Sequence, residues 1–441
     1  MIKFILFFLS LSLLIILHEF GHYITARMFK TKVNKFYLFF DFLFPFPNIL
    51  NFSLFKKKIG NTEYGLGWFP FGGYVDIDGM MGDPDDKLAK EPEPHEFRAK
   101  KPYQRLIILA GGITVNFLLA IIIFSMVSWA YGETYLPAKN AIYGVYVDPI
   151  GEKIGLKNGD KIISIDGKPA DDIHRAAVSI LLDQPKTITV EREGKQQTIN
   201  IPAGLDLKYI AKEVIPFEPG YPFVIDSIRP GTGSEFAKLQ KGDELVSIGK
   251  DTLKFAQQFN TIFLNNKTKT LDVGYKRNGV FYSTPLIVND EGEIGVYRKT
   301  EVAFFKTETK EFGFFASWGQ GWSRTISTLG NYIKQFRLLF TKVGVTKLGG
   351  FASIGKMYPS DWDWEAFWST TALISVILAF MNLLPIPVLD GGYILFIIWE
   401  MITGKKVSDK FMQKALTIGM YFVLALLVFS NGNDILRAFT K

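Results

Sequence analysis

The segment His18-Glu19-Phe20-Gly21-His22 lies near the end of an apolar run that begins at Met1. On a helix, this HExxH pattern places two imidazoles one turn apart on one face, where both can bind one zinc ion while the glutamate polarises a water molecule. The run from Met1 to Leu17 has a single charged residue, Lys3. With the apolar residues that follow, it reaches the roughly 20 residues that a bilayer-crossing helix needs. Ionisable groups inside such a helix are costly, so the motif indicates a functional site.

A secretory signal would also combine a basic residue with an apolar core. No small-x-small cleavage pattern follows this core, because residues 16–23 carry the HExxH motif instead. We therefore predict a retained transmembrane helix over residues 1–26 that includes the motif.

The composition of the 441-residue chain favours a membrane protein with several domains. Hydrophobic residues make up 48% of it, 40 residues are phenylalanine, and the mean hydropathy is +0.15. Such values are expected where much of the surface faces lipid. The net charge of +7 comes from basic residues beside apolar segments, so nucleic acid is not expected as a partner. The chain has no cysteine, which excludes disulfides, thiolate zinc ligands and a cysteine nucleophile.

Basic residues mark one side of the membrane. Arg27 and the three lysines up to Lys35 follow the first helix, and Lys56 to Lys58 come soon after. The positive-inside rule places this side in the cytosol, with the N-terminus outside. His22 lies five positions before Arg27, which is about 7.5 Å of helix rise. The motif is therefore expected shallowly below the cytosolic surface, where water can reach it.

A cytosolic region is predicted over residues 27–104. Within it, residues 61–78 mix strand formers with glycines, which predicts a β-hairpin or loop close to the membrane. Residues 83–94 are acidic and contain prolines, as is typical of a flexible solvated loop. The adjacent His95 has no partner at ligand spacing and is not expected to bind a metal.

A second apolar run, residues 105–131, returns the chain to the outside. It contains Gly111, Gly112 and Asn116. Two interpretations of these residues are equally open. They could allow close helix packing with a buried amide hydrogen bond, or they could face a substrate.

Residues 132–305 are soluble in character and contain an internal repeat. One copy includes the sequence GDKIISI at residues 159–165, and the other includes GDELVSI at residues 242–248. Both resemble PDZ domains of bacterial proteases, which implies α+β domains at residues 132–212 and 213–305. PDZ folds bind extended chain ends by strand addition, although these copies could almost equally act only as steric blocks. We expect a surface or packing role for His174.

Residues 306–364 place aromatic and aliphatic side chains at helical spacing among basic residues. We predict an amphipathic helix in the outer interface, because the segment is too polar to cross the bilayer. A helix packed against the second PDZ-like domain would show the same period.

The third crossing is predicted over residues 365–403 and the fourth over residues 411–431. The third contains the sequence NLLPIPVLDGG at residues 382–392, where prolines and glycines must break the helix. A broken segment at membrane depth is tolerated only where it faces protein or a wet cavity. Because the crossing is nearly complete at Leu384, Asp390 arrives near the cytosolic leaflet, at the depth expected for His18 and His22.

Two histidines are one ligand short of the three protein ligands that a catalytic zinc ion normally has. Asp390 is the best candidate for the third. On this interpretation Glu19 takes a proton from zinc-activated water and passes it to the leaving amine. Asn382 could donate a hydrogen bond to the substrate or the oxyanion, or it could satisfy carbonyl groups freed by Pro385 and Pro387.

The chain resembles the site-2 protease family of intramembrane zinc metalloproteases, in the branch of the bacterial regulator-of-sigma-E proteases with two PDZ domains. The resemblance rests on residues 18–22, 69–75 and 382–392, on Gly112-x-x-x-Asn116 and on the two PDZ-like copies. It implies a polytopic α-helical protein of the bacterial inner membrane with four transmembrane helices. Both termini and the PDZ-like domains would lie outside the cytoplasm.

The resemblance also implies a reaction. The expected substrates are single-pass membrane proteins of type II orientation, such as an anti-sigma factor or cleared signal peptides, cut in or next to the transmembrane segment. One zinc ion would be held by His18, His22 and Asp390, with Glu19 as the catalytic base. Residues 67–75 match a membrane-reentrant β-loop that pairs with an unwound substrate strand. The residues implied in substrate binding are Asn382, Asn116, Gly72, Gly73, Tyr74, Pro385 and Pro387.

Two other classes of function compete with this one. The first is a catalytically inactive PDZ-bearing scaffold that only binds membrane partners, although the intact ligands and Glu19 disfavour it. The second is a zinc transporter that uses the same ligands as a transit site. Three fixed ligands beside a glutamate favour retention of the metal instead.

Overall fold

The structure is a computed structural model, and it describes residues 2–43, 49–70, 72–80, 91–202, 215–336 and 348–439. The chain divides into two compact units. The first unit contains Met1–Gly132, Glu311–Phe336 and Val345–Lys441, and the second contains Glu133–Lys310.

Four helices in the described part of the first unit are long and apolar enough to cross a membrane. They are α1 (Ile2–Met28), α2 (Pro102–Tyr131), α11 (Trp364–Leu383) and α13 (Asp409–Phe439). The third is shorter than the expected 365–403, because a separate helix, α12 (Asp390–Thr403), follows a break. Prolines at 385 and 387 lack the backbone N–H groups that would continue the helical hydrogen bonds.

Small residues bring α1 and α2 into direct contact. A Cβ atom at Gly21 would lie 2.4 Å from the carbonyl oxygen of Gly111, so the two backbones touch. Close packing is therefore the interpretation of Gly111 that the structure supports. On the other side of α2, the buried residues Ala120 and Phe124 pack with Ala372 and Val376 of α11.

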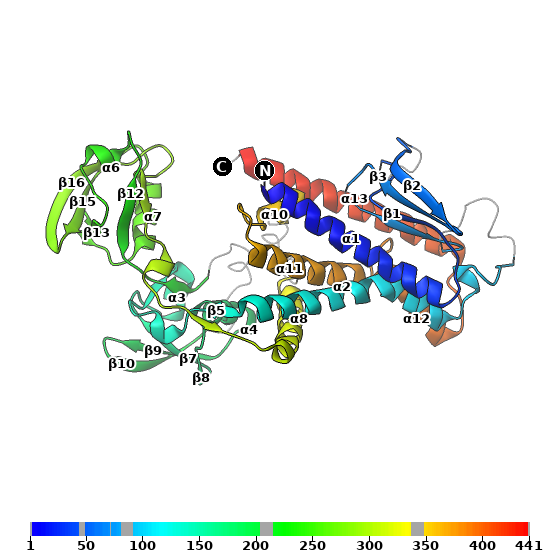
Figure 1. Cartoon of the computed structure of the whole chain (residues 1–441). Helices are drawn as coiled ribbons and strands as arrows, with labels where there is room; N and C mark the ends of the chain where they lie inside the picture. Colours follow the sequence, from blue (N-terminus) through cyan, green and yellow to red (C-terminus); the bar gives the residue numbers. More distant parts are fainter. Residues whose placement is uncertain are drawn as a thin grey trace. The chain divides into compact units, whose positions relative to one another are not determined.

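A four-stranded sheet lies beside the C-terminal half of α1 (Figure 1). Its strands are β1 (Val33–Leu38), β2 (Ser53–Ile59), β3 (Thr62–Gly67) and β4 (Tyr74–Ile77), in the order β2-β3-β1-β4. The sheet is fixed to the helix by Tyr23, whose hydroxyl lies 2.7 Å from that of Tyr64 and whose ring packs edge-on against Phe36.

Residues 61–78, expected as a β-hairpin or loop, contain two strands that do not form a hairpin with each other. Strands β3 and β4 do not pair with each other, because β1 lies between them, parallel to β3 and antiparallel to β4. The hairpin in this sheet is formed by β2 and β3. The acidic loop expected over residues 83–94 falls largely on residues 81–90, outside the described part of the chain.

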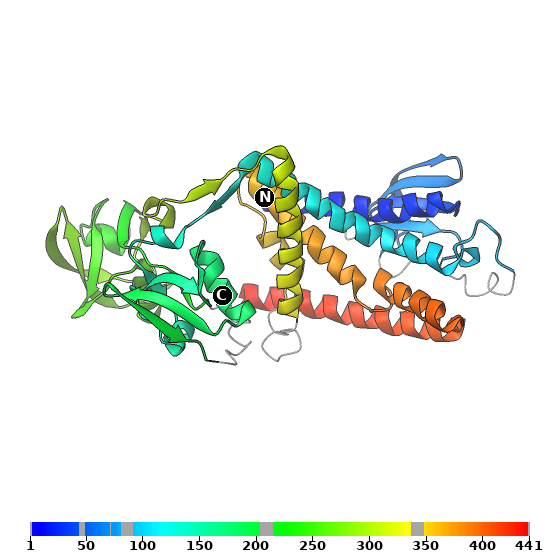
Figure 2. The same ribbon diagram turned by 90° about the horizontal axis from the view of Figure 1, so that it is seen from below.

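Helix α8 (Phe314–Phe336) crosses the long helices instead of running along them (Figure 2). Its buried residues, Ser317, Gly321 and Thr325, recur every fourth position. A Cβ atom at Gly321 would lie 2.1 Å from Oγ of Ser125, so this narrow face packs on α2. Phe315 and other aromatic side chains on the opposite face are exposed. A short helix, α10 (Phe351–Lys356), precedes α11.

The second unit consists of two lobes. The first lobe has a sheet of order β10-β9-β7-β8 and the paired strands β11-β6, and the second has a sheet of order β16-β15-β13-β12-β17 with β14 beside β13. The pair β18-β5 joins the two ends of this unit. The elements of the first lobe are β5 (Glu133–Tyr135), β6 (Val145–Val147), α3 (Pro149–Ile154), β7 (Lys161–Ile165), β8 (Lys168–Pro169), α4 (Ile173–Asp183), β9 (Thr187–Arg192), β10 (Lys195–Asn200) and β11 (Phe217–Pro219). Those that follow are β12 (Phe223–Ile228), α6 (Gly233–Phe236), β13 (Glu244–Ile248), β14 (Asp251–Thr252), α7 (Ala256–Asn265), β15 (Thr270–Arg277), β16 (Val280–Ile287), β17 (Val296–Arg298) and β18 (Glu308–Lys310).

The boundary between the lobes differs from the expected one. Residues 212 and 213 lie outside the described residues, and β11, which comes after them, pairs antiparallel with β6. Phe217 is opposite Val147 in this pairing. The first lobe therefore extends at least to Pro219.

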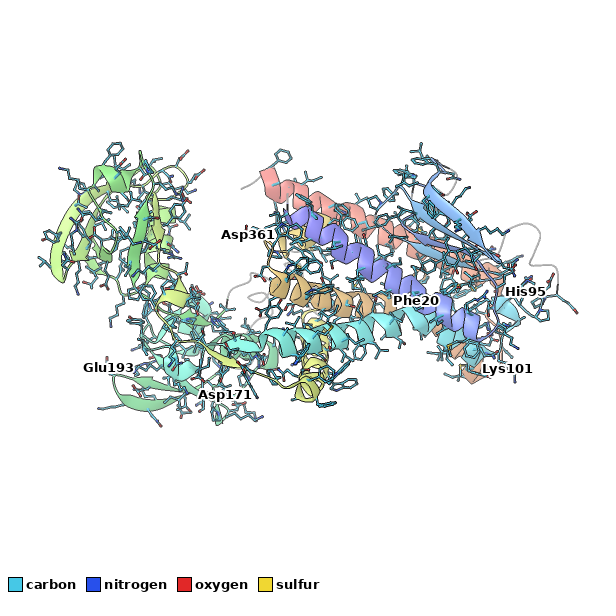
Figure 3. The ribbon with its side chains drawn as sticks, in the orientation of Figure 1. Phe20, His95, Lys101, Asp171, Glu193 and Asp361 are labelled. Atoms are coloured by element: carbon cyan, nitrogen blue, oxygen red, sulfur yellow. The ribbon has the colours of Figure 1, made fainter. Side chains whose placement is uncertain are left out.

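Both histidines outside the HExxH motif have carboxylate partners. Nε2 of His95 lies 3.1 Å from Oδ2 of Asp78, and Nε2 of His174 lies 3.0 Å from Oε1 of Glu301. Figure 3 shows His95 near Lys101, at the end of the first unit where α1 ends. Neither histidine belongs to a cluster of three or more potential metal ligands among the described residues.

Candidate active site

Three potential metal ligands from two helices converge in the first unit. His18 and His22 lie one turn apart on α1, and Asp390 is the first residue of α12. The Nε2 atoms of both histidines lie 3.3 Å from Oδ2 of Asp390 and 3.3 Å from each other. The donor atoms thus form a nearly equilateral triangle. In the described part of the chain, this is the one group of three or more such side chains with its ligand atoms so close.

The triangle fits a tetrahedral zinc ion. Ligand atoms about 2.05 Å from such an ion are about 3.3 Å apart. Oδ2 of Asp390 is buried and accepts no hydrogen bond from a described residue. An acceptor buried without a donor is costly, and a cation bound by the same atoms would remove that cost. The donor set therefore suits the metal in both spacing and chemistry.

Helix α2 orients the His22 ring. Nδ1 of His22 lies 2.9 Å from the carbonyl oxygen of Ile108. Because a carbonyl oxygen can only accept, Nδ1 carries the proton and Nε2 presents its lone pair to the other ligands. A Cβ atom at Gly112 would lie 2.5 Å from Nε2 of His22, so only glycine leaves room for the imidazoles there.

Asn116, one turn after Gly112 on α2, contacts the His18 ring of α1. Its side chain is fully buried, and its amide nitrogen is 3.2 Å from Nδ1 of His18. An imidazole that binds a metal through Nε2 must donate a proton from Nδ1. The amide oxygen of Asn116 has no hydrogen-bond partner among the described residues, and it becomes the acceptor for this proton when the amide group is turned over. Asn116 thus contacts a ligand side chain and not open space.

Glu19 lies between the ligand triangle and the sheet. Its carboxylate accepts a hydrogen bond from the backbone N–H of Val75, in the edge strand β4. Strand β1 pairs with the inner edge of β4, where Phe36 is opposite Val75. The outer edge of β4 therefore faces the glutamate.

The remaining expected substrate-binding residues fall into two groups. Asn382, near the end of α11, is partly exposed, and its amide nitrogen lies 3.3 Å from Nε2 of His18. Gly72, Gly73 and Tyr74 instead pack inside the sheet region. A Cβ atom at Gly72 would lie 2.3 Å from the Phe40 ring. The Tyr74 hydroxyl donates a hydrogen bond of 3.0 Å to Oδ1 of Asp41.

Asp390 is positioned by a strained turn in the connection between α11 and α12. Val388 has a φ of 91°, which is unusual for a β-branched residue. A Cβ atom at Gly391 would lie 2.3 Å from the carbonyl oxygen of Leu384, so the loop folds tightly onto the first turn of α12. Pro385 is exposed, whereas the carbonyl of Pro387 touches α13, only 2.0 Å from where a Cβ atom at Gly419 would lie.

The sequence reasoning missed a buried ion pair that holds α12. Nη2 of Arg105 lies 2.6 Å from Oε1 of Glu400, and both side chains are about nine-tenths buried, at 10% and 12% exposure. The pair joins α2 to α12, the helix that begins with Asp390. A signal was present, because each residue is a charge of opposite sign at the border of an apolar segment.

Comparisons with known proteins bear on this site. A family model described as peptidase family M50 matches residues 6–426. The chain is similar to a putative zinc metalloprotease of Neisseria meningitidis, with 27% identity over 98% of each chain. It is also similar to the regulator of sigma-E protease RseP of Escherichia coli, with 27% identity over 98% of each chain. The regulator of sigma E protease of Haemophilus influenzae is 26% identical over the same shares.

Proposed function

The chain belongs to peptidase family M50, and on this premise we propose that it is a zinc endopeptidase that cleaves single-pass membrane proteins in or beside their transmembrane segment. The observation that carries the proposal is the triangle of His18, His22 and Asp390 beside Glu19, on helices apolar enough to cross a membrane. Zinc metalloproteases are named among its full-length relatives. The three residues would hold the ion, and Glu19 would be the catalytic base.

A bound zinc ion would supply electrophilic assistance to the scissile carbonyl and would acidify a water molecule. Glu19 takes the proton of the attacking water and delivers it to the departing amide nitrogen. The backbone N–H of Val75 holds the Glu19 carboxylate in place. Asn382, beside His18, donates a hydrogen bond to the substrate carbonyl as negative charge develops on it.

Strand β4 is the proposed docking edge for the substrate backbone. A helical substrate hides its peptide groups, so the segment to be cut must unwind, and its free N–H and C=O groups then need partners. The outer edge of β4 offers such partners next to Glu19, as in strand addition to other sheets. Gly72 and Gly73 let the chain enter this strand close to α1, and Tyr74 secures it.

Asn116 receives a different role from the one implied by resemblance. Because it is buried and contacts Nδ1 of His18, it orients the ligand ring instead of touching the substrate. Pro385 and Pro387 are assigned to the turn that presents Asp390, for which the strained Val388 is support.

The wider setting is proposed on the same basis. Relatives named as regulators of sigma-E suggest an anti-sigma factor or cleared signal peptides as substrates. The chain would lie in the bacterial inner membrane, with the termini and the second unit outside the cytoplasm. The two lobes would be PDZ-like domains that bind peptide ends or exclude bulky substrates.

Replacement of Glu19 by glutamine tests the reaction. The Glu19→Gln protein should keep its zinc, because no metal ligand changes, but it should lose cleavage of a co-expressed single-pass substrate. Glu365→Gln, at an exposed residue of α11, is the matched control and should cleave normally. Undiminished cleavage by the Glu19→Gln protein would contradict the proposal and favour a scaffold.

A further inference from the structure

The edge strand β2 carries a surface that the proposed reaction does not use. All its residues from Leu54 to Ile59 are exposed, and its outer edge is unpaired in the sheet. We name residues 49–59 the β2 arm. The arm begins with exposed apolar side chains, among them Leu54 at 63% and Phe55 at 61% exposure, and continues with Lys56, Lys57 and Lys58.

The start of the β2 arm lies at the depth of the middle of α1. A Cβ atom at Gly73, just before β4, would lie 2.7 Å from Cγ2 of Ile15. Ile15 precedes Met28, the last residue of α1, by about 20 Å of helix rise. Ser53 pairs with Gly67 at the same end of the sheet, and Phe52 stacks on Trp68. If α1 crosses a bilayer, this end of the sheet is level with hydrocarbon.

The polarity of the arm changes along the strand and not across it. Successive side chains of a strand point to opposite faces, so Lys56 and Lys58 lie on one face and Lys57 on the other. Lys57 is only three residues, about 10 Å, from Leu54. A flat protein surface packed on one face of the strand would leave the lysine of the other face unpaired, whereas a layer of phosphate groups through which the strand passes could bind all three.

The lysines and the apolar residues need one common explanation. Exposed lysines on an edge strand can simply prevent aggregation, and these three form no ion pair with a described residue. That role leaves the neighbouring exposed Leu50, Phe52, Leu54 and Phe55 unexplained, since such a cluster is unfavourable in water. An apolar end followed by cations matches the profile of a leaflet from hydrocarbon to headgroups.

We propose that the β2 arm is a lipid anchor, in which the apolar start inserts into the leaflet where α1 ends and Lys56, Lys57 and Lys58 bind the phosphate groups of anionic phospholipids. The anchor fixes the depth of the whole sheet. Strand β4 belongs to that sheet, so lipid charge would also set the position of the proposed docking edge.

The lack of cysteine in the chain makes a direct test possible. A nitroxide on Leu54→Cys reports depth through its relative accessibility to oxygen and to a water-soluble nickel chelate. The full chain is reconstituted in bilayers of phosphatidylcholine alone or with phosphatidylglycerol. We expect the label to favour oxygen, and to shift further towards oxygen when phosphatidylglycerol is present. In a Lys56→Gln, Lys57→Gln, Lys58→Gln background this shift should be lost.

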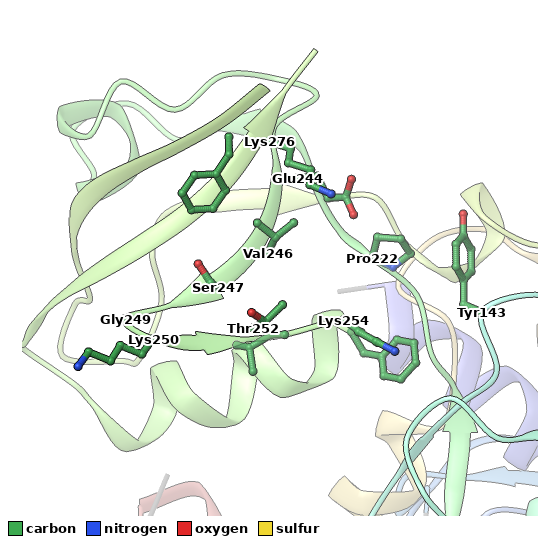
Figure 4. A pocket seen from close by; sticks show the side chains of 13 residues that line it. Tyr143, Pro222, Glu244, Val246, Ser247, Gly249, Lys250, Thr252, Lys254 and Lys276 are labelled. Atoms are coloured by element: carbon green, nitrogen blue, oxygen red, sulfur yellow. The ribbon is translucent and has the colours of Figure 1, made fainter. Parts of the chain in front are cut away.

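A matched control removes three other lysines. Lys250, Lys254 and Lys276 line a cavity of about 620 Å³ in the second unit and form no ion pair with a described residue (Figure 4). Their replacement by glutamine changes the net charge equally and should leave the shift intact. The proposal is overturned if the label at position 54 favours the nickel chelate in both bilayers, or if the shift survives in the background without Lys56 to Lys58.

Discussion

The sequence left two roles equally open for Asn116 on α2: a buried amide hydrogen bond, or a contact with the substrate. Asn116 is buried against His18, so replacement by leucine should leave Nδ1 of His18 without an acceptor. We expect Asn116→Leu to weaken zinc affinity about 10- to 100-fold, as is typical for groups that orient a metal ligand. Asn116→Asp keeps an acceptor and should largely retain the affinity. Competition with a chromogenic chelator measures both.

The same pair of variants distinguishes a substrate role. If Asn116 contacts the substrate, Asn116→Leu would bind zinc normally and lose only cleavage. Ser128→Ala, a buried change elsewhere on α2, is the control for helix packing and should not alter zinc affinity.

At the residue level, the sequence was most informative where chemistry and spacing coincide. The HExxH motif predicts the geometry of His18 and His22, because i and i+4 share a helix face. Asp390 was predicted from its depth and from the missing third zinc ligand, since a lone carboxylate in an apolar segment requires a partner. The carbonyl of Ile108 could not be predicted, because every residue has a carbonyl and only the packing of α2 brings this one to His22.

At the level of elements, the position of α12 depends on its contact with α2. Removal of one partner of a buried ion pair typically costs about 3–5 kcal/mol, because the other charge is left unpaired. We therefore expect Glu400→Met to lower the unfolding temperature in detergent and to reduce bound zinc, since α12 begins with Asp390. Arg105→Met should do the same.

The double variant provides the decisive comparison. Arg105→Met with Glu400→Met removes both charges and should recover most of the lost stability, because an apolar pair of similar volume often substitutes for a buried ion pair. If the stability lost in the double variant equals the sum of the losses in the two single variants, the two residues act independently.

The sheet illustrates what element prediction from sequence lacks. Alternation and glycines in residues 61–78 correctly indicate strands, but the order β2-β3-β1-β4 depends on pairing between segments far apart in the chain. Val33 to Leu38 pairs on both sides, with β3 and with β4. Local pattern carries no information about which neighbour a strand will choose, so the insertion of β1 between β3 and β4 could not be predicted.

Across the whole molecule, the internal repeat has a physical basis in each lobe. Asp160 and Asp243 are each 1% exposed, and each binds an arginine at 2.7 Å, Arg192 in one lobe and Arg277 in the other. The repeated Gly-Asp pair is therefore a buried ion-pair turn that recurs, which explains why it was visible in the sequence. The boundary between the lobes was not visible, because β11 returns to the first lobe after a segment without a clear pattern.

The charges at the helix ends predict one orientation for the whole chain. Arg27 follows the core of α1, Lys101 precedes α2, and Lys405 and Lys406 lie between α12 and α13, whereas Asp361 and Asp363 precede α11. With basic ends inside, a reporter inserted after Tyr131 should be active outside the cytoplasm and one after Thr403 inside. Alkaline phosphatase and a green fluorescent protein, each inserted at both sites in separate fusions, measure the orientation. Alkaline phosphatase should be active only after Tyr131, and the fluorescent protein only after Thr403. The reverse pattern would place the ligand triangle near the outer leaflet, because His22 lies only about 9 Å of helix rise from Met28. The second unit, which follows Tyr131, would then lie in the cytosol, and the proposed filter would act on the cytosolic part of a substrate while Glu19 cut near the opposite leaflet.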